Sequence, residues 1–302
     1  MNKKIIAGTL GLASILSSCS IPEIKDFEEP KSIPINIIET ENNITGANKF
    51  LRKFPEELIG SGEIRKYETS GANKCLIHLL QAHYSDPETL FGEEYDETKK
   101  EEFLDKFNII YRTINRVQKD IFQIIYDLEE KKLIDKVYAE GIYFKPTENY
   151  IKKIIKHRID KLRDFGVLSN EFENAETEKY FYIAGSAFIS NSVLNLEIFP
   201  AENKKLYQDA IHNFSSQPEM IEKDHEKRED YFLEMISTKE DLSPLILFGG
   251  HHSFAGKESF QDYIPKGRKS IKDNIKEWNS KNPQSKFSLI EIIPKSYNLI
   301  LE

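Results

Sequence analysis

Cysteine is almost absent from this chain, whose 302 residues contain only Cys19 and Cys75. A disulfide framework requires several paired cysteines, so the fold cannot depend on one. Cys75 stands inside an apolar run, which predicts a small buried core residue. Positive charge is also in deficit, with 42 Lys and Arg against 50 Asp and Glu and a formal net charge of −8. Because no basic block offsets this acidic balance, we expect no nucleic acid as a partner.

Several common catalytic motifs are missing as well. The sequence contains no glycine-rich phosphate-binding loop, no internal repeat and no low-complexity block. The charged stretch that begins at His225 lacks the second histidine of a zinc-protease helix, because position 229 is a glutamate. Gly185-Ser186-Ala187 lacks the second glycine of a nucleophile elbow. A serine hydrolase that pairs Ser186 with His252 remains a minor alternative.

No apolar run near the amino terminus is long enough to span a bilayer. Residues 5–16 form an apolar stretch of about a dozen residues, whereas a spanning helix needs roughly 20. This stretch follows Lys3 and Lys4, an arrangement typical of a secretory signal peptide over residues 1–18. Leu16-Ser17-Ser18-Cys19 resembles the lipobox of bacterial lipoprotein precursors, which implies cleavage before Cys19 and acylation of that residue. The alternative is an ordinary signal peptide with a cysteine there by coincidence.

The lipobox resemblance implies an extracytoplasmic protein that Cys19 anchors to a bacterial-type membrane, inner or outer. Residues 19–48 are rich in Pro, Glu and Asn and have no sustained periodicity, so we interpret them as a flexible tether. Residues 49–302 are then expected to form one folded domain.

Strand-like and helix-like patterns alternate along that domain. Apolar residues recur every three or four positions from Phe103 to Leu128 and predict the strongest helix. Further helices are expected over residues 151–165, within 200–236 with a break near Pro218, and over 271–278. Strands are expected over residues 75–82, 136–139, 180–189, 193–199, 245–248 and 287–293, the third and fourth paired through Ser190-Asn191-Ser192. Alternation of this kind predicts an α/β fold with a central mixed sheet flanked by helices and a site at the carboxyl ends of its strands.

Polar residues follow three of the expected strands at the point where each strand ends. His83 follows the first, Glu140 follows the second, and Gly249, His251 and His252 follow the strand that begins at Leu245. Two imidazoles and a carboxylate form a ligand set suited to Zn, Mn or Fe, with positions left for water. Adjacent residues at a strand end point in opposite directions, so only one of His251 and His252 is expected to be a ligand.

The order of these features resembles a superfamily that includes ChaN haem-binding lipoproteins, TraB and Tiki proteins and the erythromycin esterases. The resemblance covers about residues 70–295 and rests on His83, Glu140, Gly185-Ser186-Ala187, Pro200-Ala201-Glu202, Arg228 and Gly249-x-x-His252. It implies an α/β fold, favours His252 over His251, and assigns Arg228 to a helix. Leu80 stands where the first motif of that superfamily has glycine, and Gln81 replaces an acid found there in several members.

Two functions from different classes follow from these residues. The first is a metal-dependent hydrolase of a small molecule or peptide. His83, His252 and Glu140 would hold the metal or activate its water, with Glu140 and Arg228 as the catalytic residues and Arg228 stabilising developing negative charge. The second is a lipoprotein that binds haem or a similar metal-containing group at Gly249, His251 and His252, with histidine or tyrosine coordinating the iron. A catalytically silent member that acts as an interaction module is a third reading.

Overall fold

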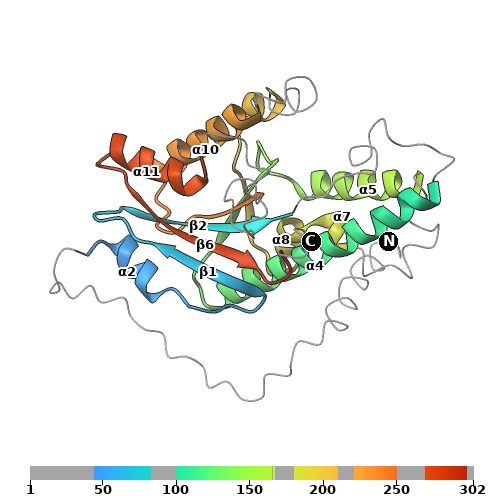
Figure 1. The fold of residues 1–302 in the computed structure, drawn as a ribbon, viewed down its shortest axis with the longest axis horizontal. Helices are drawn as coiled ribbons and strands as arrows, with labels where there is room; N and C mark the ends of the chain where they lie inside the picture. Colours follow the sequence, from blue (N-terminus) through green and yellow to red (C-terminus); the bar gives the residue numbers. More distant parts are fainter. Residues whose placement is uncertain are drawn as a thin grey trace, which may run out of the picture.

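A six-stranded sheet organises the part of the chain that the computed structural model describes, which comprises residues 44–82, 100–164, 166, 180–209, 221–249 and 269–297. The strands are β1 (Ser61–Tyr67), β2 (Lys74–Gln81), β3 (Lys136–Ala139), β4 (Glu197–Pro200), β5 (Leu245–Gly249) and β6 (Phe287–Pro294). The helices are α2 (Gly46–Lys53), α4 (Lys100–Glu130), α5 (Glu148–Asp164), α7 (Tyr180–Ala184), α8 (Ser186–Leu194), α10 (Ile221–Ser237) and α11 (Ile271–Lys281), arranged as Figure 1 shows.

The strands lie in the order β1-β6-β2-β5-β3-β4. β1 runs antiparallel to β6 at one edge, and all the other neighbours are parallel. β5 therefore lies between β2 and β3, although it comes much later in the sequence. This order brings the carboxyl ends of β2, β5 and β3 side by side, and ligand sites in α/β folds form at such an edge.

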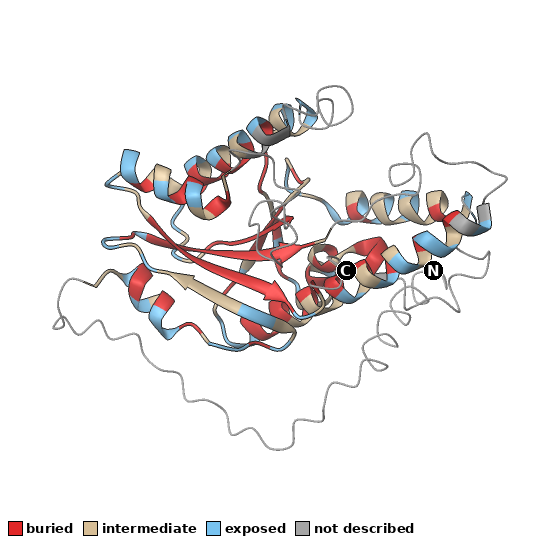
Figure 2. Ribbon diagram, in the orientation of Figure 1, coloured by how far each residue is buried: buried red, intermediate tan, exposed pale blue. Residues whose placement is uncertain are grey.

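Helices cover both faces of the sheet, so that its central strands are buried along their whole length (Figure 2). On one face, α2 and α4 pack against alternate strand residues that include Ile77, Leu79 and Leu247. On the other face, α10 and α11 pack against residues such as Leu76 and Ile246. Successive strand residues point to opposite faces, so a strand buried on both sides becomes a continuous apolar run.

The predicted α/β class, mixed sheet and flanking helices are confirmed. The strands expected from residues 75, 136, 245 and 287 all form, and the long periodic segment is α4. Cys75 is fully buried, as expected. Among the described residues, no helix is long and apolar enough to cross a bilayer.

The prediction of a strand over residues 180–189 was wrong, and the strand expected over 193–199 is confirmed only for residues 197–199. Residues 180–194 form α7 and α8, and the expected turn at residues 190–192 lies inside α8. The four residues 181–184 are all buried, because α4 and α5 enclose α7 from different sides. A helix enclosed in this way has a continuous apolar sequence, which periodicity cannot distinguish from a buried strand. Only residues 197–200 are extended, and they pair in parallel with β3 instead of forming a hairpin.

Two elements near the amino terminus of the domain had no sequence prediction. α2 begins at Gly46, where the hydroxyl of Thr45 accepts a hydrogen bond from the N–H of Asn48 and caps the helix. Helix α2 therefore begins inside the range 19–48 assigned to the tether. β1 carries the charged residues Glu63, Arg65 and Lys66 at the edge of the sheet and has no fully buried residue, which is typical of an edge strand.

Candidate functional site

The carboxyl ends of β2, β5 and β3 lie level with one another. Gln81, the last residue of β2, is the register partner of Gly249, the last residue of β5. The N–H of Glu140 donates to the carbonyl of Leu247 at 3.1 Å and continues the pairing of β3 with β5. The three strand ends from which the candidate histidines follow in the sequence are therefore neighbours.

Glu140 links two of these strand ends through its carboxylate. Its Oε2 accepts a hydrogen bond from the N–H of Gly249 at 2.7 Å. Its Oε1 accepts one from Nη2 of Arg228 at 2.6 Å, and only 8% of the Glu140 side chain is exposed. A carboxylate this buried requires such donors, because burial without them would be costly. Glu140 thus fixes the end of β5 directly before Gly250-His251-His252.

Arg228 holds a second buried carboxylate, that of Glu202. Its Nε donates to Oε2 of Glu202 at 2.7 Å, and its Nη2 also donates to Oε1. The N–H of Gly141 donates to the same Oε1 at 2.9 Å. Burial by itself would lower the pKa of Arg228, but the charges and hydrogen bonds of Glu140 and Glu202 raise it above its usual value. Since two carboxylates already engage the guanidinium, its main contribution is to position Glu140 and Glu202.

The site assignment from the sequence did not include Glu202. Its position resembles that of Glu140, because Pro200 at the end of β4 is the register partner of Ala139 at the end of β3. An acidic residue shortly after a strand end was therefore the available signal. This signal was hard to recognise because the strand was expected over residues 193–199, and its first residues belong to α8.

The ring of Tyr207 packs against this charged cluster. The ring centroid of Tyr207 lies 5.9 Å from Cζ of Arg228, within the range of a cation–π contact. Burial, together with the nearby charges of Glu202 and Glu140, raises the pKa of Tyr207 above its usual value. Tyr207 is therefore a neutral hydrogen-bonding group at neutral pH.

Gln118 of α4 joins the end of β2 to the start of α8. Its Nε2 donates to the carbonyl of Ala82, which directly precedes His83 in the sequence. Its Oε1 accepts from the N–H of Ser186 at 2.7 Å. Ser186 is thus at the carboxyl edge of the sheet, but at a junction between two helices instead of the strand-to-helix turn of a nucleophile elbow.

A buried histidine lies on β2, where the sequence analysis had found only an apolar strand. Nε2 of His78 lies 3.3 Å from the carbonyl oxygen of Phe248, and Nδ1 lies 3.8 Å from Oε1 of Glu291 on β6. His78 is completely buried and Glu291 nearly so. His78 thus contacts the peptide group between Phe248 and Gly249, the same group whose N–H donates to Glu140.

The candidate metal ligands are only partly covered by the structure. Glu140 and Gly249 are described, whereas His83, His251, His252 and the lipidation residue Cys19 lie outside the described residues. Within the described ranges, no group of three or more His, Cys, Asp or Glu side chains could hold a metal ion. A metal ion at this end of the strands would therefore need at least one ligand from outside the described residues, and His83, His251 and His252 are the candidates.

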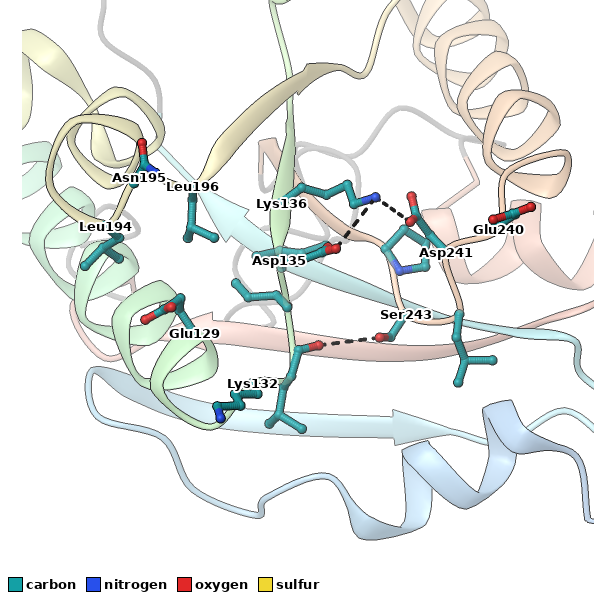
Figure 3. Close-up of a pocket in the computed structure, with 15 residues that line it drawn as sticks. Glu129, Lys132, Asp135, Lys136, Leu194, Asn195, Leu196, Glu240, Asp241 and Ser243 are labelled. Carbon is teal, nitrogen blue, oxygen red and sulfur yellow. Dashed lines mark hydrogen bonds and ion pairs between the residues drawn. The ribbon is translucent and has the colours of Figure 1, made fainter. Parts of the chain in front are cut away.

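An open pocket of about 620 Å³ lies at the opposite ends of the strands, near the amino ends of β3 and β5 (Figure 3). Its lining includes the start of β3 at Lys136, the end of α8 at Leu194 and Asn195, and Asp241. Lys136 donates to Asp241 at 2.6 Å, so the charges in the pocket are partly paired with each other. The pocket contains none of the candidate site residues.

Comparisons with protein-family models, with curated proteins and with solved structures find no match to this chain. The functional argument therefore rests on the residues and their geometry.

Proposed function

We propose that this chain is a lipid-anchored extracytoplasmic hydrolase that depends on a divalent metal ion and acts on a small molecule or peptide. The observation that carries the proposal is the hydrogen bond from the N–H of Gly249 to the carboxylate of Glu140. It ties the end of β3 to the end of β5, beside the end of β2. His83 follows β2 by two residues and His252 follows β5 by three, so their main chains start from neighbouring strand ends.

The charges of the described cluster are compatible with a cation nearby. Glu140 and Glu202 provide two carboxylates against the single guanidinium of Arg228. Oε1 and Oε2 of Glu140 accept hydrogen bonds from Arg228 and Gly249, and a carboxylate oxygen that accepts a hydrogen bond can also bind a metal ion. His83, His252 and Glu140 would hold a Zn, Mn or Fe ion, and a bound ion lowers the pKa of its water and makes a nucleophile available near neutral pH.

Hydrogen bonds among the described residues support the proposal, because they hold the residues around the proposed site in place. Arg228 holds Glu140 and Glu202 in fixed positions, and Glu140 in turn fixes Gly249. A site whose supporting residues are already hydrogen-bonded loses little entropy when its ligand binds.

Anchoring at the membrane is proposed from the sequence. Lys3, Lys4 and the apolar residues 5–16 support export, and Leu16-Ser17-Ser18-Cys19 supports acylation of Cys19. The chain between Cys19 and α2 could extend at most about 90 Å. This reach would place the domain near the membrane surface without fixing its orientation.

Elemental analysis of the full-length protein, purified without chelator, tests the metal. We expect stoichiometric Zn, Mn or Fe that is lost in His83→Ala and His252→Ala. His157→Ala is the matched control, because His157 is exposed on α5 and should leave the metal content unchanged. A wild-type protein without metal, or equal metal content in all variants, would contradict the proposal. A Soret band that His252→Ala abolishes would instead identify a haem-binding lipoprotein.

Incorporation of a clickable fatty acid tests the anchor. Cys19→Ala should abolish labelling and Cys75→Ala should leave it unchanged, because Cys75 is buried in β2. Labelling that survives loss of Cys19 would refute the anchor.

A further inference from the structure

The amino end of α8 lies at the same edge of the sheet as the proposed site. Gln118 holds the N–H of Ser186 and the carbonyl of Ala82 at once, and so binds the start of α8 to the end of β2. Phe188, in the first turn of α8, belongs to the same buried cluster as Ala139, the last residue of β3. The opposite end of α8 lines the pocket at the amino edge of the sheet (Figure 3). The helix therefore runs antiparallel to the strands and directs its first turn toward the ends of β2 and β3.

The N-cap residue of this helix is Gly185, with φ of 78°, which has no side chain to cap the first turn. The first turn contains no acidic residue. Ser186 donates its N–H to Gln118, but among the described residues no acceptor is recorded for the N–H of Ala187 or Phe188. N–H groups without an acceptor and the helix dipole make such a terminus attractive to an anion.

A buried hydroxyl at the same place is the second, independent observation. Ser186 is only 1% exposed, and its Oγ has no hydrogen-bond partner. In an α-helix the Cα–Cβ bonds tilt toward the amino terminus, so the hydroxyl of the first residue lies near the unbonded N–H groups. A buried polar group without a partner costs free energy, and a bound ligand that accepts its hydrogen bond would remove that cost.

We infer that the first turn of α8 and the hydroxyl of Ser186 form a binding subsite for an oxyanion, the carboxylate or phosphate group of a ligand. Three donors converge there, namely Oγ of Ser186 and the N–H groups of Ala187 and Phe188. This subsite also supplies hydrogen-bond donors for an anion. Arg228 does not supply them, because two carboxylates already engage its guanidinium. The inference rests on the proposed function only for the identity of the ligand, since anion binding itself needs no metal.

The same helix offers a matched control. Ser190 lies one helical turn after Ser186, is also completely buried, and its Oγ also has no partner. It is too far along α8 to reach the unbonded N–H groups of the first turn. Ser186→Ala and Ser190→Ala therefore remove the same chemical group from the same helix, and only the first removes it from the subsite.

The test is titration of the full-length protein in detergent with inorganic phosphate, followed by calorimetry, with and without chelator. We expect Ser186→Ala to weaken phosphate binding about tenfold or more, as for loss of a hydrogen bond to a charged group. Ser190→Ala should bind as the wild type does. Absence of binding by the wild type, or equal weakening in both variants, would overturn the subsite. If Ser186→Ala does not fold, the isosteric pair Ser186→Thr and Ser186→Val replaces it, and binding must persist only in the variant that keeps the hydroxyl. Elemental analysis tests the proposed metal site separately, so failure of that proposal can be distinguished from failure of the subsite.

Discussion

His78 and Glu140 contact opposite sides of one peptide group, the one between Phe248 and Gly249. The carbonyl oxygen of Phe248 lies 3.3 Å from Nε2 of His78 on β2. The N–H of Gly249 donates to Oε2 of Glu140 at the end of β3. A carbonyl can only accept, so the first contact is a hydrogen bond when Nε2 carries the proton of His78. The last peptide group of β5 is thus fixed from both neighbouring strands, directly before Gly250-His251-His252.

Replacing Glu140 with glutamine should destabilise the domain by roughly 1–3 kcal/mol. The glutamine amide keeps the shape but cannot accept from both Arg228 and the N–H of Gly249, so one buried donor loses its partner. Chemical denaturation followed by far-ultraviolet circular dichroism measures the free energy of unfolding. Glu148→Gln is the control, because Glu148 forms an exposed ion pair with Lys152 at the start of α5 and should change stability very little. Equal effects in the two variants would contradict the role given to Glu140.

His78→Leu should cost roughly 2–4 kcal/mol, because it removes both the contact with Phe248 and a polar neighbour of buried Glu291. The double-mutant cycle with Glu291→Leu measures the interaction between the two side chains. We expect the double variant to be less destabilised than the sum of the single variants by at least about 0.5 kcal/mol. Additive costs would mean that the two groups do not interact in spite of their 3.8 Å separation.

The sequence predicted Glu140 and Gly249 at the site because both residues directly adjoin a strand end. It did not predict Glu202, Gln118 or His78, whose roles depend on the order of strands in the sheet. His78 stands in the middle of an apolar run and has no local signal of its own. Its contact with Phe248 exists only because β5 inserts beside β2, far along the chain. Local periodicity carries no information about such an insertion.

The errors around α7 and α8 have a different cause. Residues 181–184 are enclosed by other helices, so their sequence has no polar face to mark a helix. Gly185, with its positive φ, separates the two helices and was interpreted as part of a strand. This misplacement concealed the position of Ser186 at a helix terminus.

Cys75 should resist thiol reagents in the native protein. Burial raises the pKa of its thiol to about 12, so almost no thiolate exists at pH 8. An unperturbed cysteine has a pKa of about 8.5, so as the pH rises the thiol ionises in the unfolded chain before it ionises in the folded protein. The contribution of the neutral thiol to stability is therefore fully present below about pH 8.5 and is lost as the pH rises toward the folded pKa. Ellman's reagent should therefore detect no thiol in the native protein and one after denaturation. Detection of two thiols would contradict acylation of Cys19, and rapid labelling of the native protein would contradict the burial of Cys75.

The ionised carboxylate of Asp241 should stabilise the folded domain at neutral pH but not in acid. Burial would raise the pKa of this carboxyl group, but hydrogen bonds from Lys136 and Tyr138 more than offset burial and hold the pKa below its usual value. A lowered folded pKa stabilises the protein above the unfolded value of about 3.9, and this stabilisation is lost as the pH falls through the folded value.

Asp241→Asn should therefore reduce the free energy of unfolding by about 1 kcal/mol at pH 7, and the difference from wild type should shrink below about pH 4. Asp135→Asn is the matched control for the same lysine. Asp135 lies 3.9 Å from Nζ of Lys136, and its side chain is 83% exposed, so its removal should leave stability within error at every pH. A pH-independent difference for Asp241→Asn would mean that it acts through packing instead of through the charge of the carboxylate.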